Sequence, residues 1–209
     1  MQTLAQLETH LRHRLALPLP GAAAQWRFAP TPARKGWRPD DRPVTARQAA
    51  ALILLYPGEH GPSFPLTVRH EDLPHHPGQI SLPGGGLDPG EDPIAGALRE
   101  AHEEIGIHPR DVRIIGALSS LWVIVSNFLV HPYIAVADAR PEFRAHPREV
   151  AALIEAPVKA FTDSARIRQQ ERIRDGLAVR YPYFDVEGHH VWGATAMMLG
   201  EFSEILTDR

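Results

Sequence analysis

The chain has 209 residues, a formal net charge of −3 and 44% hydrophobic residues, which is the composition of an ordinary globular domain. So balanced a charge gives no overall attraction to nucleic acid or to an anionic membrane, and we expect neither as a partner. The absence of cysteine excludes disulfides, thiolate metal ligands and cysteine nucleophiles. Glu8, Arg12 and Arg14 stand where a signal peptide would be apolar, so a cytoplasmic location is expected.

The N-terminal part of the chain is predicted to differ from the rest. An amphipathic helix is predicted over residues 1–17, because leucines recur there at steps of three and four: Leu4, Leu7, Leu11 and Leu15. Residues 18–45 are rich in proline and glycine, and we expect an irregular segment that wraps the main domain or links to it. The chain is therefore divided into an N-terminal helix with an irregular Pro/Gly/Arg-rich segment at residues 1–45 and a main domain at residues 46–209.

The main domain mixes strands and helices. Its predicted strands are residues 49–56, 65–69, 79–82, 112–118, 128–137 and 150–155. They are followed by a short helical turn after Pro157, a hairpin over residues 166–186 and a closing helix over residues 192–206. Because the order shows no regular strand–helix alternation, it favours an α+β class with a mixed β-sheet over a doubly wound parallel sheet.

The strongest helix signal covers residues 93–105, directly after a glycine-rich loop. Asp92 is a good N-cap, Pro93 a good first helical residue, and Gly106 can end the helix. At 100° per residue one apolar stripe should face the core: Ile94, Leu98, Ala101 and Ile105. Gly96 lies on the opposite side, where it would leave room for an approaching group.

The same helix carries an acidic stripe made by Glu100, Glu103 and Glu104. Carboxylates at this spacing repel one another, and Arg99 can pair with Glu103 while the other two still face each other. Hard divalent cations such as Mg²⁺ or Mn²⁺ relieve this repulsion and take further ligands from a phosphate. The stripe and the glycine loop before it therefore suggest metal-assisted attack of water on a phosphoanhydride.

Residues 83–107 resemble the Nudix box, G-x5-E-x7-R-E-U-x-E-E-x-G-U, where U is a bulky aliphatic residue. The positions that carry the resemblance are Gly85, Glu91, Arg99, Glu100, Ala101, Glu103, Glu104, Gly106 and Ile107. Only Ala101 departs, as a small residue at an aliphatic position. Chance agreement at the fixed positions is on the order of one in a million. The resemblance implies a Nudix fold, an α/β/α sandwich with a mixed β-sheet.

The resemblance also implies roles. It places Mg²⁺ or Mn²⁺ on Glu100, Glu103 and Glu104, together with the backbone carbonyl of Gly84. The catalytic set that it implies is Glu91, Arg99, Glu103 and Glu104, in which Arg99 and Glu91 support the cluster by ion pairing. A glutamate takes the proton of the attacking water, and which glutamate does so stays open.

Two other interpretations remain beside this one. The first is an ordinary acidic surface helix after a glycine turn, which the complete box pattern argues against. The other is a nucleotide-binding module that has lost catalysis, which the intact R-E-x-x-E-E pattern argues against.

The residues before the box resemble the element that precedes it in coenzyme A pyrophosphatases. The matching positions are Leu66, Thr67, Arg69, Gly78, Pro83, Gly84 and Gly85, and the departures are Pro65, His70, Pro74 and Leu82. The segments around Phe128 and Trp192 resemble the same subfamily. The substrate-binding residues expected from this likeness are Arg69, His76, Gly78, Gln79, Ser81, Gly84 and Gly85.

The subfamily resemblance implies hydrolysis of coenzyme A or acyl-CoA to 3′,5′-ADP and 4′-phosphopantetheine or its acyl derivative. The 3′-phosphate would need cations, for which Arg113, Arg166 and Arg168 are further candidates. Pro74 stands where the subfamily pattern has an arginine, so another substrate such as ADP-ribose or a nucleoside triphosphate is the alternative. A homodimer is possible, but no interface is visible in the sequence.

Overall fold

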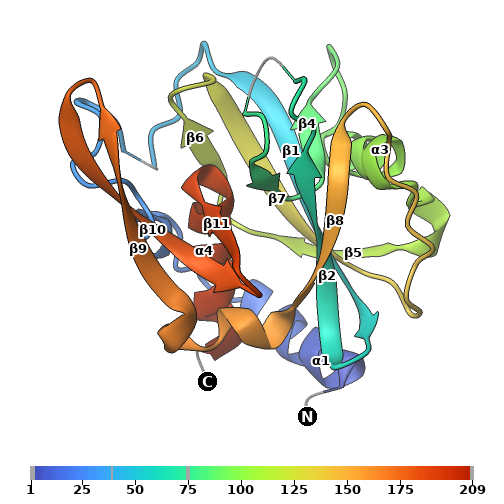
Figure 1. Cartoon of the computed structure of the whole chain (residues 1–209). Helices are drawn as coiled ribbons and strands as arrows, with labels where there is room; N and C mark the ends of the chain where they lie inside the picture. Colours follow the sequence, from blue (N-terminus) through green and yellow to red (C-terminus); the bar gives the residue numbers. More distant parts are fainter. Residues whose placement is uncertain (1–2, 39, 74–75, 208–209) are drawn as a thin grey trace.

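The computed structural model describes residues 3–38, 40–73 and 76–207 (Figure 1). Strand β1 (Arg47–Gly58) crosses the middle of the molecule, and residues 49–56 of it are buried on both faces. Ala51, Ile53 and Leu55 enter one hydrophobic cluster, whereas Leu52 and Leu54 enter another on the opposite face. This continuous apolar run makes β1 the centre of a sheet that is covered on both sides.

Within the described residues, eight strands form the main sheet. Its central order is β3 (Ile80–Ser81), β2 (Gly61–Arg69), β1, β7 (Phe128–Val136) and β5 (Arg113–Ala117). Three strands join it from the side: β4 (Gly84–Gly86) on β1, β6 (Leu121–Val123) on β7, and β8 (Val150–Pro157) on β2. The pairing of β1 with β7 is parallel and the others are antiparallel, so the sheet is mixed.

A smaller antiparallel sheet contains β9 (Ile167–Arg174), β10 (Leu177–Val186) and β11 (His189–Trp192). Short 3₁₀ turns connect the larger elements: Pro109–Asp111, Val158–Phe161 and Ser164–Arg166. The predicted hairpin and the helical turn after Pro157 are thereby confirmed.

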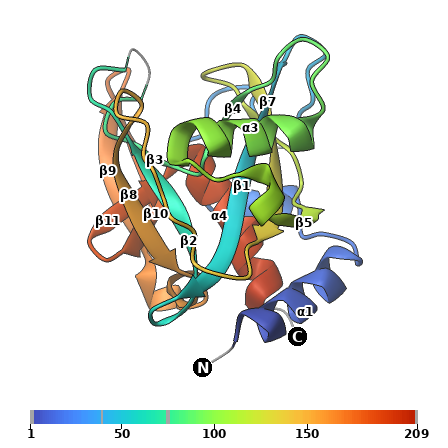
Figure 2. The ribbon, with the colours of Figure 1, turned by 90° about the vertical axis from the view of Figure 1, so that its right-hand side faces the viewer.

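Helices cover both faces of the main sheet. Helix α3 (Pro93–Ile105) lies on one face, and α4 (Gly193–Thr207) with α1 (Leu4–Leu15) packs on the other side (Figures 1 and 2). The arrangement is the α/β/α sandwich that the sequence predicts, and the α+β class is confirmed. None of the described helices is both long enough and apolar enough to cross a membrane.

The N-terminal segment is part of the same core. Leu7 and Leu11 of α1 are fully buried, and Phe28 and Trp37 join them in the larger hydrophobic cluster. A short helix, α2 (Ala22–Trp26), interrupts the segment predicted to be irregular and packs on α4. Residues 3–38 therefore wrap the sheet as one of its covering layers.

Three short strands were not predicted. The glycines of β4 have no strand propensity, and β4 forms because the chain there lies against Ala49–Ala51 of β1. The other two, β6 and β11, have three and four residues, too few for a periodic pattern. All three depend on pairing with a partner strand rather than on a local signal.

Candidate active site

Helix α3 begins and ends as its sequence predicts. The Asp92 carboxylate accepts hydrogen bonds from the backbone N–H groups of Ile94 (2.9 Å) and Ala95 (3.2 Å), and Pro93 is the first helical residue. Gly106 ends the helix in the left-handed conformation, at φ 76°. Asp92 and Gly106 therefore set the two ends of α3, and with them the positions of the glutamates that lie on it.

The predicted apolar stripe of α3 is confirmed for Ala101, Ile105 and partly buried Leu98, and it is wrong for Ile94. Ala97, Ala101, Glu104 and Ile105 are buried, whereas Ile94 is 37% exposed. Ile94 is exposed because α3 packs on β1 through its small alanines, Ala97 and Ala101. Glu104 lies on this buried side of the helix. Tertiary packing thus overrides the hydrophobicity of a single residue.

Gly96 leaves no space for a ligand, contrary to the prediction. A Cβ there would overlap the Leu87 side chain and lie 3.1 Å from a carboxylate oxygen of Glu91. The small residue instead allows the loop between β4 and α3 to pack on the helix.

Arg99 connects most of the predicted catalytic set. Its Nε donates to Glu91 (2.8 Å), and its Nη1 donates to Glu100 (2.8 Å) and Glu103 (3.0 Å). Its Nη2 donates to the second Glu91 oxygen and to the Gly86 carbonyl, both at 3.0 Å. The ion pair expected between Arg99 and Glu91 is therefore present, and Arg99 also holds two of the three clustered glutamates.

Glu104 is the buried member of the acidic stripe. It is 4% exposed, and its carboxylate accepts a hydrogen bond from the Gly84 N–H at 3.1 Å. Burial raises the pKa of Glu104 to about 7, helped by the charge of Glu100 and opposed by the Gly84 hydrogen bond and by Arg69. A cation close to Glu104 would stabilise its charged form, which burial disfavours.

Glu100 lies against the glycine strand β4. A Cβ on Gly85 would come within 2.5 Å of the Glu100 carboxyl carbon, so only glycine leaves room for this side chain. Burial raises the pKa of Glu100 as well, against the effect of Arg99. The β4 glycines therefore make a cradle for two carboxylates, Glu100 and Glu104.

The chemistry of these donors fits a hard divalent cation. Glu100 and the more deeply buried Glu104 both have a pKa raised by burial, and with the glycine backbone they offer oxygen ligands of the kind that Mg²⁺ and Mn²⁺ prefer. Glu103 differs from them, because 53% of its side chain is exposed and it pairs with Arg99. In the part of the chain that is described, no three His, Asp or Glu side chains converge closely enough to hold a metal by themselves.

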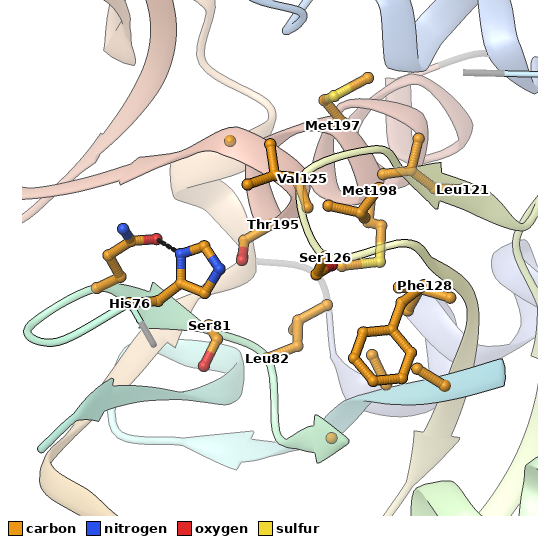
Figure 3. Close-up of a pocket in the computed structure, with 18 of the residues that line it drawn as sticks. His76, Ser81, Leu82, Leu121, Val125, Ser126, Phe128, Thr195, Met197 and Met198 are labelled. Atoms are coloured by element: carbon orange, nitrogen blue, oxygen red, sulfur yellow. Dashed lines mark hydrogen bonds between the residues drawn. The ribbon is translucent and has the colours of Figure 1, made fainter. Parts of the chain in front are cut away.

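A pocket of about 450 Å³ lies beside this cluster, on the other side of β4. Polar His76, Ser81 and Thr195 occupy one side of it, and Leu82, Phe128 and Met198 occupy the other (Figure 3). Gly84, Gly85 and Gly86 line it, but the glutamates of α3 do not. A ligand in the pocket would therefore reach the carboxylates across the glycine strand.

The predicted substrate-binding residues gather at this pocket with one exception. Those that line it are Arg69, His76, Gln79, Ser81, Gly84 and Gly85. Gly78 lines no part of the pocket, and it has a positive φ of 64° in the turn where His76 Nδ1 lies 3.1 Å from the Gln79 amide oxygen. Pro74, at the position of the missing arginine, lies outside the described residues.

The further arginines expected to hold a phosphate lie elsewhere. Arg113 pairs with Glu8 and Asp138, Arg166 with Asp163, and Arg168 with Asp185, and none of the three lines the pocket. They were poor candidates because each stands close to an acid that the fold brings beside it.

Other residues line the pocket that sequence reasoning missed. Arg34 and Trp37 come from the N-terminal segment, Arg174 from β9, and Met197 with Met198 from α4. For Met197 and Met198 the sequence offered one signal, the resemblance of the segment around Trp192 to the coenzyme A pyrophosphatases. Arg34 and Arg174 carry no local signal, because only the fold brings their segments together.

The chain thus has a mixed sheet between helices, and the glutamate-bearing helix α3 packs beside the glycine strand β4, which borders a pocket. The family model of the NUDIX domain matches residues 46–175. The curated protein named "Uncharacterized Nudix hydrolase NudL" from Enterobacter sp. (strain 638) is 37% identical over 161 residues, which cover 77% of this chain and 83% of that protein. The protein of the same name from Pectobacterium atrosepticum is 34% identical over 178 residues, with 82% and 89% covered.

Among solved structures, the MutT protein from Methanosarcina mazei Go1 has a TM-score of 0.51 at 17% identity, over 80% of this chain and 100% of that one. This likeness shows the fold alone. With the sequence relatives it leads to one conclusion: the chain belongs to the Nudix hydrolase family, whose members are pyrophosphohydrolases that act on acid anhydrides.

Proposed function

We propose that this enzyme is a Mg²⁺- or Mn²⁺-dependent pyrophosphohydrolase that cleaves coenzyme A or acyl-CoA. The products are 3′,5′-ADP and 4′-phosphopantetheine or its acyl derivative. The observation that carries the proposal is the pocket, because its lining includes Arg69, Gly84 and Gly85, three positions of the element that resembles the one in coenzyme A pyrophosphatases. Another part of the lining is apolar, which suits the uncharged pantetheine arm or an acyl chain.

The residues of the box have separate tasks in this proposal. Glu100, Glu104 and the Gly84 backbone hold the metal, with Glu103 at the exposed side. When bound, the metal lowers the pKa of the attacking water and offsets the charge of the pyrophosphate. Arg99 and Glu91 act as positioning residues, because their hydrogen bonds orient Glu100 and Glu103. Arg69, which lines the pocket, would pair with the pyrophosphate.

The test is product analysis after incubation with coenzyme A and Mg²⁺ or Mn²⁺, with ADP-ribose and a nucleoside triphosphate in parallel. We expect 3′,5′-ADP from coenzyme A, and at least about a hundredfold less of it from the Glu104→Gln variant. Glutamine keeps an oxygen for the Gly84 N–H, so this variant removes the charge without removing the hydrogen bond.

Glu59→Gln, at the exposed turn between β1 and β2, is the matched control and should keep full activity. If coenzyme A survives while ADP-ribose or the triphosphate is cut, the substrate assignment is wrong and the box assignment stands. If Glu104→Gln keeps the activity of the unaltered enzyme, the role of Glu104 is wrong.

A further inference from the structure

The charges that line the pocket have one sign. Three arginines line it, Arg34, Arg69 and Arg174, and among the described lining residues there is no carboxylate. An apolar pocket with several cations and no acid suits a ligand that carries more than one anionic group.

The arginines belong to different parts of the pocket. Arg69 ends β2, and its charge lowers the pKa of Glu104, which places it beside the carboxylate cluster. Arg34 and Arg174 line the pocket from two other segments, the N-terminal segment and the β9–β10 hairpin, which we call the rim. These two segments lie side by side (Figure 1). Leu82 and Phe128 belong to the apolar part of the lining (Figure 3).

Several hydrogen bonds hold this rim together. The backbones of Thr31 and Arg180 exchange two hydrogen bonds, of 2.8 and 2.9 Å, and the Arg174 guanidinium donates to the Pro32 carbonyl at 3.0 Å. The Trp37 indole donates to the Trp122 carbonyl, also at 3.0 Å, and so ties the segment to β6. The rim is therefore a fixed part of the structure, although its segments are far apart in the sequence.

The segment is also anchored below the rim. Phe28 stacks on Phe184 of β10 with ring centroids 4.4 Å apart, and buried Gln25 donates to Glu201 of α4 at 3.0 Å. Arg34 is thus exposed between the buried anchors Phe28 and Trp37, outside the residues that the family model matches.

We propose that Arg34 and Arg174 form a second phosphate site, which binds a phosphate group of the substrate remote from the scissile pyrophosphate. This rests on the proposed function, in which that group is the 3′-phosphate of coenzyme A. A guanidinium is a planar fork that can hold a phosphate through two parallel hydrogen bonds, and two guanidiniums from facing segments can hold it from both sides. The rim then selects substrates that carry this extra phosphate over those that lack it.

The test compares coenzyme A with dephospho-coenzyme A, which lacks the 3′-phosphate, for Arg34→Gln and Arg174→Gln. We expect KM for coenzyme A to rise about tenfold or more with kcat unchanged, and KM for dephospho-coenzyme A to stay the same. Lys35→Gln beside Arg34 and Arg180→Gln on the same hairpin are matched controls, because neither residue lines the pocket. Equal effects on the two substrates, or none, would overturn the proposal.

A binding measurement separates this proposal from the proposed function. Calorimetry on the unaltered protein should show tighter binding of 3′,5′-ADP than of 5′-AMP, and Arg34→Gln should abolish the difference. Unaltered protein that leaves coenzyme A intact contradicts the proposed function. Equal affinity for the two nucleotides contradicts the second phosphate site, whatever the activity on coenzyme A.

Discussion

Glu100, Glu103 and Glu104 would repel one another on a bare helix, and Arg99 explains how they coexist in the folded chain. One nitrogen of its guanidinium donates to both Glu100 and Glu103, while the others hold Glu91 and the Gly86 carbonyl. Glu104 instead receives the Gly84 N–H. Burial raises the pKa of Glu104 in spite of this hydrogen bond, and a cation beside the carboxylate would stabilise its charged form.

Glu91 should make the stability of the fold depend on acid. The hydrogen bonds from Arg99, and then that from the Asp88 N–H, lower the pKa of Glu91 from 4.5 to about 2. A carboxyl whose pKa is lower in the folded state stabilises the fold above its unfolded pKa, and that stability is lost as the pH falls from 4.5 towards 2. Urea unfolding of Glu91→Gln should show less loss of stability over this interval than the unaltered protein. Equal losses in the two proteins would contradict the assignment.

Gly84 and Gly85 should respond differently to alanine. A Cβ on Gly84 would overlap the backbone of Ala50, so Gly84→Ala should lower the free energy of unfolding by about 2 kcal/mol or more. A Cβ on Gly85 meets only the end of the Glu100 side chain, so Gly85→Ala should fold but displace that carboxylate.

Urea unfolding and Mn²⁺ titration distinguish these outcomes. Gly85→Ala should keep its unfolding free energy and lose Mn²⁺ affinity about tenfold or more. Gly86→Ala is the control, because its Cβ would lie 3.5 Å from Phe128, an ordinary contact. Unchanged Mn²⁺ affinity in Gly85→Ala would argue against Glu100 as a ligand.

At the scale of elements, a buried carboxylate of α4, Glu201, helps to hold the N-terminal segment. Glu201 accepts hydrogen bonds from the N–H groups of Gly21 (3.0 Å) and Ser119 (3.1 Å) and from the Gln25 amide (3.0 Å). Burial nevertheless raises its pKa, since desolvation outweighs these donors. This carboxylate connects three elements that contribute to the pocket rim or support it.

Glu201→Gln should lower the free energy of unfolding by about 2–3 kcal/mol, because an amide N–H₂ would face backbone N–H donors where an oxygen accepted them. The variant should also expose residues 18–45 to limited proteolysis. Glu204→Gln on the same helix is the control, since Glu204 forms an ion pair with exposed Arg27 at 3.3 Å. If both variants behave alike, Glu201 does not anchor the segment.

At the scale of the whole molecule, α1 shares one hydrophobic core with the sheet. Leu11 is fully buried in the cluster that contains Ile53, Phe64 and Phe202. Leu11→Ala should therefore lower the free energy of unfolding by about 2–4 kcal/mol, and the molecule should still unfold in one transition. Leu17→Ala is the control, because Leu17 is 41% exposed. A separate early transition in Leu11→Ala, with the main one unchanged, would show that the N-terminal segment unfolds independently.

The sequence by itself determined the local features of this protein. The N-cap Asp92, the terminal Gly106 and the spacing of the glutamates identify the α3 helix and the family box, because each signal acts within a few residues. Leucine spacing determined α1 in the same way, and long apolar runs determined β1 and β7.

Only the tertiary structure decided that Ile94 is exposed and Glu104 is buried, that three glycines form β4, and which arginines line the pocket. Ile94 lost its predicted place to small alanines packed on β1, and β4 exists only through its pairing with Ala49–Ala51. Arg34 and Arg174 line the same pocket because the N-terminal segment pairs with the β9–β10 hairpin through Thr31 and Arg180. Such contacts depend on the packing of distant segments, which no local pattern of side chains specifies.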